Sequence, residues 1–353
     1  MTAIALAAGE ALRTYRYKPS APRRRSNPDH TALLLSGGGN MTFFHLGVVK
    51  VLRTGGLLPR VFSGASAGAV IGGLLATRTD RELDLLHEDE FAFINFADRQ
   101  PHDQYTAEML AEQLASVLPD VTFAEAEEIS GRALNISLAA IGDGGVICGP
   151  RTTPHVLVRD AVRASCAVPF VFEPVVVHER RHGRVQPFRS GQGWVDGSLY
   201  ADVPAKFIKR HYQVRHTIVS LVNPAVRPFV PDHGQSRGPT ALMRGMAMRA
   251  AHKAALGVAQ IGRFSASSRA RNMFEAARRV MQQRYHGDLV LTPSRRLVWS
   301  DLLDHPSREL VTRLMADGEA RTRARLDEVR ALALRDLPSR QVAYQPQPAY
   351  AFA

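Results

Sequence analysis

The residue with the clearest chemistry in this chain is a serine set between glycines. Ser66 lies in the run Gly-Ala-Ser-Ala-Gly at 64–68, between an expected strand and an expected helix. A serine on a sharp strand-to-helix turn projects its hydroxyl out of the sheet, and its neighbours must be small for the turn to close. The N-terminus of the following helix favours developing negative charge. The run predicts a nucleophile elbow with Gly64 and Gly68 around Ser66; a close-packed turn without catalysis is the alternative.

A run of three glycines precedes this serine. Gly37, Gly38 and Gly39 follow the first expected strand, about 28 residues before Ser66. Consecutive glycines can turn their backbone N–H groups into a pocket without obstruction, as an oxyanion hole requires. A phosphate-binding loop would need Gly-Lys-Ser or Gly-Lys-Thr, and a dinucleotide loop would need the G-x-G-x-x-G spacing; the run has neither. It predicts an oxyanion hole, with a flexible turn as the alternative.

A carboxylate at the end of a later strand is the candidate base for the serine. Asp196 ends a strand-like run and is followed by Gly197. An Asp-Gly pair is often only a turn, so its role depends on whether the fold brings it to Ser66. The alternative layout is a Ser-His-Asp triad of the α/β-hydrolase kind, which needs a late histidine such as His286 or His305.

The segments around these residues alternate between strand and helix patterns. The runs TALLL, RVFSG, ALNISLAAI, GGVICGP and HTIVSLVNP are short and apolar, whereas FHLGVVKVLRTGG and ASAGAVIGGLLATR have helical spacing. Strands that alternate with helices in this way predict an α/β fold with a parallel, doubly wound sheet. His45 and His155 lie near the expected active loops, and we interpret both as structural.

Basic charge is concentrated in two segments outside the expected core. The 353 residues include 45 Lys and Arg against 33 Asp and Glu, a net charge of +12. Residues 1–30 contribute +4 and residues 225–285 contribute +9, so the rest of the chain sums to −1. We expect a flexible basic tail over 1–30, a catalytic core over 31–225, a helical basic extension packed on the core over 226–335, and a disordered tail over 336–353.

These basic segments bear on the partners of the protein. Basic stretches favour nucleic acid or anionic lipid, and the absence of helix-turn-helix, RNP and zinc-finger signatures argues against nucleic acid. We expect contact with an anionic membrane or lipid-droplet surface; a solvated basic face, or packing of the Met-rich stretch 236–285 on the core, is the alternative. Two cysteines, and no basic residue ahead of the apolar N-terminal stretch, predict a cytoplasmic protein, and the basic segments place it peripheral to a membrane in the interpretation that involves lipid.

Three short motifs in one order resemble those of the patatin-like phospholipase family. They are Ser-Gly-Gly-Gly at 36–39, Gly-Ala-Ser-Ala-Gly at 64–68 and Asp-Gly-Ser at 196–198. The run Ala-Ser-Cys-Ala-Val-Pro at 164–169 is similar to a small-residue segment of that family. The resemblance covers the chain from about the first strand to the last expected one.

Within that family, two stretches look most like the lipid-droplet triacylglycerol lipases. They are residues 33–68 and the run Val-Ser-Leu-Val-Asn-Pro at 219–224. Two positions depart from the commoner loop of the family, with Ser36 in place of an aspartate and Met41 in place of a basic residue.

The resemblance implies a patatin-like three-layer α/β fold with a mainly parallel central sheet flanked by helices. It further implies a serine acyl hydrolase of lipid esters, either phospholipids or acylglycerols, with a Ser66–Asp196 dyad and oxyanion donors at Gly37, Gly38 and Gly39. Such an enzyme needs no metal and no cofactor. An acyltransferase that uses the same acyl-enzyme, or a non-catalytic membrane-binding module, is the alternative.

Overall fold

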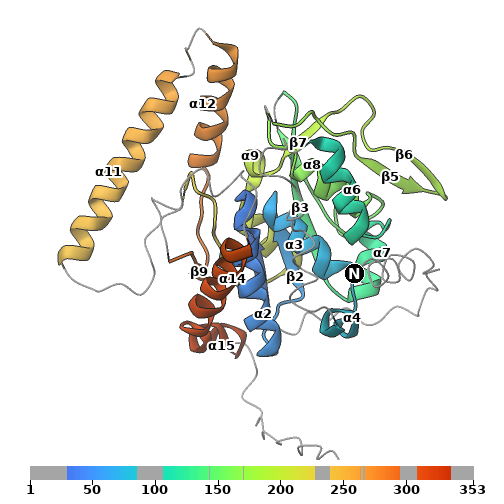
Figure 1. Ribbon diagram of the computed structural model, residues 1–353, viewed down its shortest axis with the longest axis horizontal. Coiled ribbons are helices and arrows are strands. Elements are labelled where there is room, and N and C mark those ends of the chain that lie inside the picture. Colours follow the sequence, from blue (N-terminus) through green and yellow to red (C-terminus); the bar gives the residue numbers. More distant parts are fainter. Residues whose placement is uncertain are drawn as a thin grey trace, which may run out of the picture.

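A computed structural model describes residues 30–85, 106–142, 144–169, 171–226, 239–262, 264, 267–294 and 308–334. The predicted tails at 1–30 and 336–353 lie outside these ranges, except for His30. Figure 1 shows a sheet surrounded by helices, with two long helices standing beside it.

A seven-stranded sheet forms the centre of the molecule, in the order β4-β3-β2-β1-β8-β9, and β7 pairs with β3 off this path. The strands are β1 (Thr31–Leu35), β2 (Val61–Gly64), β3 (Ala133–Ala140), β4 (Gly145–Cys148), β7 (Trp194–Asp196), β8 (His216–Ser220) and β9 (Leu289–Leu291). The pairs from β3 through β2, β1 and β8 to β9 are parallel, and only β4 and β7 run antiparallel to β3. The predicted α/β fold with a mainly parallel central sheet is confirmed.

One strand falls in a segment that the sequence predicted as helical. β9 lies within 226–335 and extends the sheet beyond β8, which was the last strand we expected. Its three residues are all buried. A three-residue strand is too short to show a period of its own, so sequence patterning does not distinguish it from a loop.

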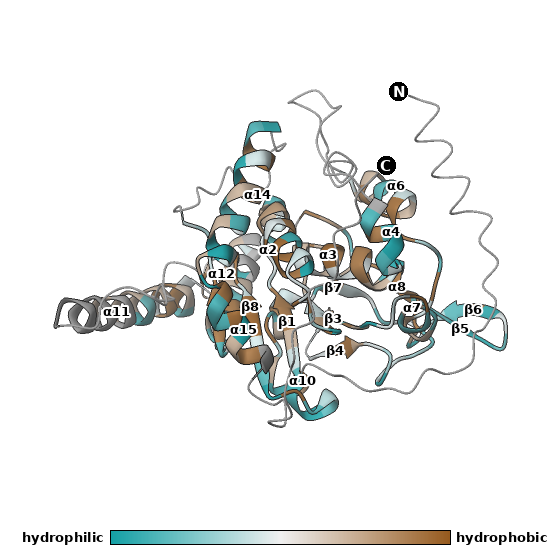
Figure 2. Cartoon of the chain, turned by 90° about the horizontal axis from the view of Figure 1, so that it is seen from below, coloured by the Kyte–Doolittle hydropathy of each residue, from teal (hydrophilic) through white to brown (hydrophobic). Residues whose placement is uncertain are grey.

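Helices and a short second sheet complete the fold. The helices are η1 (Gly39–Met41), α2 (Thr42–Thr54), α3 (Ala67–Ala76), α4 (Asp80–Leu85), α6 (Ala107–Val117), α7 (Phe123–Ser130), α8 (Val158–Ser165), α9 (Ser198–Ala201), α10 (Ala205–Tyr212), α11 (Pro239–Gly262), α12 (Ser268–Met281), α14 (Arg308–Arg323) and α15 (Leu326–Leu334). The second sheet pairs β5 (His178–Arg181) with β6 (Arg184–Pro187). In Figure 2 this hydrophilic ribbon projects from one side of the molecule.

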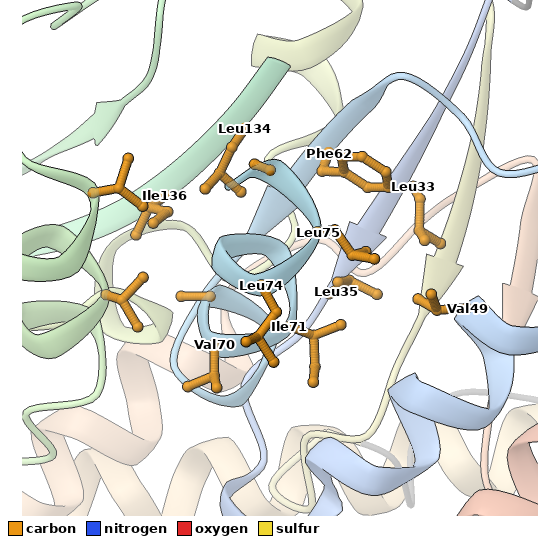
Figure 3. Close-up of a cluster of buried hydrophobic side chains, with 14 of the residues drawn as sticks. Leu33, Leu35, Val49, Phe62, Val70, Ile71, Leu74, Leu75, Leu134 and Ile136 are labelled. Atoms are coloured by element: carbon orange, nitrogen blue, oxygen red, sulfur yellow. The ribbon is translucent and has the colours of Figure 1, made fainter. Parts of the chain in front are cut away.

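The central sheet is buried on both faces, which is why its strands are almost continuously apolar. Along β1, Leu33 and Leu35 point to one face and join the core formed with α2, α3, α8 and α14. Ala32 and Leu34 point to the other face, where residues of α10 and of the segment after α12 cover them. Figure 3 shows α3 lying over the first face, with its side chains directed at those of β1, β2 and β3. Two helical layers therefore enclose one sheet.

Helix α14 is part of this core layer, because it packs against α2 with almost no space between the backbones. A Cβ added to Gly318 would overlap the Phe44 carbonyl oxygen, and one added to Gly47 would lie 2.9 Å from the Glu319 nitrogen. Sequence patterning predicts one helix over 305–335; the structure has two, α14 and α15.

Helices α11 and α12 form a pair that stands away from the sheet, and α12 leads back toward α9 (Figure 1). Three large apolar side chains in the C-terminal part of α11 and just after it are exposed: Val258 by 62%, Ile261 by 74% and Phe264 by 77%. No helix in the described ranges is both long enough and apolar enough to cross a bilayer.

Candidate active site

Strand register brings the predicted nucleophile and the predicted base to the same edge of β3. β2 runs parallel to β3 and ends with Gly64 opposite Ile136. β7 approaches from the other end, antiparallel, and ends with Asp196 opposite Leu138. The two strand ends thus lie opposite β3 positions that are two apart, with only Ser137 between them, about 7 Å along the strand. Side chains that follow β2 and end β7 must meet in this gap.

Ser66 occupies the gap in a strained backbone conformation. Its φ of 49° and ψ of −119° are unusual for a residue with a side chain, and it forms the N-cap of α3. Residues in such regions persist only where the surroundings hold them. Here the Ser66 N–H donates to Ser165 Oγ at 2.9 Å, and Ser165 Oγ donates to the Ser137 carbonyl oxygen at 2.9 Å. Ser66 thus lies on a tight turn between the end of β2 and the start of α3.

The turn needs glycine at positions 64 and 68, because there is no room for a Cβ atom at either. A Cβ at Gly64 would lie 2.7 Å from the Ala69 nitrogen, and one at Gly68 would lie 2.7 Å from the Leu35 Cβ. Both distances are below those that real Cβ atoms keep from other heavy atoms. Gly64 and Gly68 therefore let α3 start directly against β1 and β2, which places the helix N-terminus at Ser66.

Asp196 lies in contact with this serine and is buried, with 4% of its surface exposed. The Ser198 N–H donates to Asp196 Oδ1 at 2.8 Å, and the side chains of Ser198 and Ser66 also stabilise the charged form of the carboxylate. Burial raises the pKa of Asp196, and these hydrogen bonds oppose the rise only in part. A carboxylate with a raised pKa is a better proton acceptor near neutrality than an exposed aspartate.

The glycine loop lies beside the same serine. A Cβ at Gly37 would be 3.3 Å from the Ser66 Cβ and 3.3 Å from the Ser198 Cβ. Gly39 has a φ of 53°, which favours glycine. Gly38 is the N-cap of η1 and Gly39 its first residue, so their N–H groups precede the first intrahelical donor. The Gly37 N–H, in contrast, donates to Asp202 Oδ1 at 2.6 Å. The three amides predicted as oxyanion donors are therefore not equivalent, because that of Gly37 already has an acceptor.

His45 holds the entry to the glycine loop. It is fully buried, and burial lowers its pKa to about 4, so it is neutral at pH 7. Its Nε2 donates to the Ser36 carbonyl oxygen at 2.9 Å, and its Nδ1 accepts from Ser220 Oγ at 2.7 Å. Ser36 Oγ in turn accepts the Val222 N–H at 2.8 Å. His45 has the structural role that we inferred from the sequence.

The other histidines considered above do not form a triad in the described structure. His286 and His155 are exposed, and His305 lies outside the described residues. Within the described ranges, no group of three or more His, Cys, Asp or Glu residues could hold a metal ion.

Sequence reasoning missed two residues of this region. Asp202 is 1% exposed and bonds the glycine loop, and Ser165 is fully buried and bonds the Ser66 amide. Each lies in a run that attracted notice for another reason: Asp202 is five residues after Gly197, and Ser165 is in the small-residue run at 164–169. An acid close to a candidate base was the available signal for Asp202.

Comparison with known proteins finds one family over the part of the chain that contains this site. The profile of the family described as patatin-like phospholipase matches residues 33–208. A patatin-like phospholipase domain-containing protein of Aspergillus terreus is 35% identical over 219 residues, and one of Yarrowia lipolytica is 34% identical over 214 residues. The matches cover 58% and 56% of this chain but only 31% and 26% of those proteins. The chain thus corresponds to less than a third of the length of these relatives.

VipD from Legionella pneumophila is 14% identical, with a TM-score of 0.45, over 90% of this chain and 73% of its own. Similarity at this level adds nothing to the sequence match.

Proposed function

Since residues 33–208 of this chain belong to the patatin-like phospholipase family, we propose that the protein is a serine acyl hydrolase of lipid esters. The observation that carries the proposal is that Ser66, on its strained turn at the N-terminus of α3, lies close enough to the buried Asp196 carboxylate for its side chain to lower the pKa of that group. A serine hydroxyl is a weak nucleophile at its own pKa and is activated by an adjacent base.

In the first half of the reaction, Ser66 Oγ attacks the ester carbonyl carbon while Asp196 accepts the hydroxyl proton. The negative charge that forms on the carbonyl oxygen is stabilised by the N–H groups of Gly38 and Gly39 and by the N-terminus of α3. Collapse of the tetrahedral intermediate breaks the bond to the leaving alcohol, which takes the proton from Asp196. The product of this half is an acyl-enzyme on Ser66.

In the second half, water attacks the acyl-enzyme and Asp196 accepts a proton from it. The second tetrahedral intermediate uses the same backbone donors, and its collapse releases the fatty acid and returns the proton to Ser66. The dyad differs from a triad because no histidine carries the proton between serine and carboxylate. A raised pKa on Asp196 is what allows a carboxyl group to do this work.

Labelling with a fluorophosphonate probe tests the nucleophile. We expect wild type and Ser116→Ala, which alters an exposed serine on α6, to be labelled and to hydrolyse p-nitrophenyl esters. Ser66→Ala should lose both, and Asp196→Asn should lose turnover while it keeps its melting temperature. Labelling that persists in Ser66→Ala, or turnover that persists in Asp196→Asn, would overturn the assignment.

We propose that the enzyme prefers acylglycerols to phospholipids as substrates. The support is the resemblance of residues 33–68 and 219–224 to the triacylglycerol lipases of the same family. A panel of triacylglycerol, diacylglycerol and phosphatidylcholine, each tested with wild type and Ser66→Ala, measures the preference. A higher Ser66-dependent rate on phosphatidylcholine than on either acylglycerol would refute it.

We also propose that the C-terminal part of α11, together with Phe264 just after it, binds an anionic lipid surface, from the cytoplasmic side. Val258, Ile261 and Phe264 are exposed there, and the sequence over 225–285 carries eleven basic and two acidic side chains. Apolar side chains that insert at the headgroup boundary and basic side chains that attract anionic headgroups act together in interfacial binding. In Figure 1 the C-terminal end of α11 and the N-terminal end of α12 lie at the same end of the molecule as α9 and β7, where the site is.

Sedimentation with vesicles tests this surface. Wild type should bind vesicles of phosphatidylserine and phosphatidylcholine more strongly than vesicles of phosphatidylcholine alone. Ile261→Asp should weaken that binding several-fold. Val185→Asp changes a side chain on β6 that is 55% exposed and serves as the matched control. Equal binding by the two variants would contradict the proposal.

A further inference from the structure

A second buried carboxyl group lies next to the dyad and plays no part in the proton transfers described above. Asp202 follows α9 and is 1% exposed. Its Oδ1 accepts the Gly37 N–H at 2.6 Å, and its Oδ2 accepts from Asn223 Nδ2 at 2.8 Å. The Tyr285 hydroxyl, which donates to the Val280 carbonyl oxygen at 3.3 Å, also lies close enough to Asp202 to lower the pKa of that carboxyl group. Both carboxyl oxygens therefore have donors, and one donor is the glycine loop itself.

The Gly37 amide belongs to a peptide group that is held from both sides. Its carbonyl half is that of Ser36, which accepts from His45 Nε2 at 2.9 Å. Its N–H half donates to Asp202. A peptide group is planar, so fixing its oxygen and its hydrogen fixes its orientation. The backbone that leads into Gly38 and Gly39 starts from this plane.

Asp202 is itself held by the segment after α12. Its N–H donates to Gln283 Oε1 at 2.7 Å, and Gln283 Nε2 donates to the Ser198 carbonyl oxygen at 2.6 Å. Gln283 and Tyr285 lie outside the residues that the family profile matches. The C-terminal half of the chain thus supports the residue that contacts the glycine loop.

The electrostatics of Asp202 are those of an acid in a low-dielectric site. Burial raises its pKa to about 7, and the nearby Asp196 charge adds to the rise, whereas the bonds from Gly37 and Asn223 oppose it. Burying a carboxyl group away from water costs free energy unless hydrogen bonds to it compensate. An amide such as asparagine would occupy the same volume without that cost.

We infer that Asp202 is a positioning residue for the oxyanion hole, because its carboxyl group holds the Gly37 amide and thereby directs the Gly38 and Gly39 amides toward the carbonyl oxygen of an ester bound at Ser66. The inference rests on the proposed function, since it assigns a role in the same reaction. Gly37 is close enough to Ser66 for this to matter, with 3.3 Å between its Cβ position and the Ser66 Cβ. A shift of about 1 Å in such a group can reduce a rate 10²-fold.

The hydrogen-bond pattern supplies a variant pair that tests the role. In Asp202→Asn, the amide oxygen can accept from Gly37, but its NH₂ group then faces the NH₂ group of Asn223, and two donors oppose each other. In the double variant Asp202→Asn with Asn223→Asp, the donor at 202 faces an acceptor at 223. The second oxygen of residue 223 still accepts the Ala225 N–H, which Asn223 Oδ1 accepts at 3.1 Å in the wild type. The exchange keeps the hydrogen bonds to Gly37 and Ala225 and the one between the two side chains. It moves the carboxyl group from residue 202 to residue 223.

The experiment measures kcat and KM for a p-nitrophenyl ester in wild type, Asp202→Ala, Asp202→Asn and the double variant, with melting temperatures as the check on folding. We expect kcat to fall about 10²-fold in Asp202→Ala and about 10-fold in Asp202→Asn, with KM within about twofold. The double variant should recover kcat to within about threefold of wild type. A merely structural role would lower the melting temperature without this kcat pattern.

Two results would overturn the inference. One is a wild-type kcat in folded Asp202→Asn or folded Asp202→Ala. The other is a double variant that folds but recovers no more activity than Asp202→Asn. Should Asp202→Ala not fold, the comparison of Asp202→Asn with the double variant decides alone. Failure of the proposed function is distinct from these results, because it would appear as wild-type protein without turnover or Ser66 labelling.

Discussion

Replacement of Gly197 by alanine should disrupt the site by a steric clash alone. The backbone of Gly197, with a φ of −67° and a ψ of −20°, is one that alanine adopts easily. Yet a Cβ there would overlap the Ser137 carbonyl oxygen and lie 3.0 Å from the Ser137 Cβ. The obstacle is the backbone of β3, a central strand, so the chain at residue 197 must move by about 1 Å or more to relieve the overlap.

That movement acts on the residue next to it, Asp196, which must stay in contact with the Ser66 hydroxyl. Overpacking of this kind costs about 1–3 kcal/mol of stability, and a displacement of about 1 Å at a reacting group costs about 10²-fold in rate. We therefore expect Gly197→Ala to lower the melting temperature by several degrees and to lower kcat by about 10²-fold.

The assay is ester turnover together with thermal unfolding of the same preparations. Gly257→Ala is the matched control, because a Cβ there meets nothing within 4 Å and the residue lies inside α11. Alanine in a helix interior is more favourable than glycine by up to about 1 kcal/mol, so the control should be as stable as wild type or slightly more. Wild-type kcat and melting temperature in Gly197→Ala would show that β7 does not approach β3 as described.

Four further outcomes are expected from the same structure. Ser165→Ala removes the acceptor of the buried Ser66 N–H and should cost about 1–3 kcal/mol in urea unfolding and lower kcat; unchanged values in both would contradict this. In Gly47→Ala the new Cβ would overlap the Met315 carbonyl oxygen, so the free energy of unfolding should fall by a similar amount and the urea midpoint should be lower. An unchanged midpoint would show that α14 does not pack against α2 as described. Burial raises the pKa of Asp196, so kcat/KM should rise with pH through a limb that lies above the ordinary aspartate pKa, and a limb at pH 4 or below would be inconsistent. The folded-state pKa of Asp202 is raised to about 7, so its contribution to stability is greatest below the unfolded pKa of about 3.9 and is lost as pH rises toward 7. Asp202→Asn has no carboxyl group there, and its melting temperature should therefore fall less over this pH range than that of wild type. Equally steep falls in the two proteins would show that another group causes the pH dependence.

Local features of the chain were readable without a structure. The elbow at Ser66 occupies five consecutive residues, and the need for small neighbours at a strand-to-helix turn is a local steric requirement. The alternation of strands and helices predicted the parallel sheet for the same reason, since the apolar period of each element lies within the element. The glycine run was visible too, although not the fact that the Gly37 amide is occupied.

The partnership of residues far apart in the chain was decided by strand order and register. Asp196 reaches Ser66 because β7 runs antiparallel along β3 beyond the point where β2 ends. The bond from Gly37 to Asp202 spans 165 positions, and no pattern within either segment encodes it. β9 was likewise missed, because three residues have no period.

The sequence by itself determined the turn at Ser66 and the class of fold, since both follow from steric and apolar patterns over neighbouring residues. Only the tertiary structure decided which carboxyl group faces the serine and which holds the glycine loop. The physical reason is that Asp196 and Asp202 are the same residue type six positions apart, and their different partners arise from where β3, β8 and the segment after α12 lie in space.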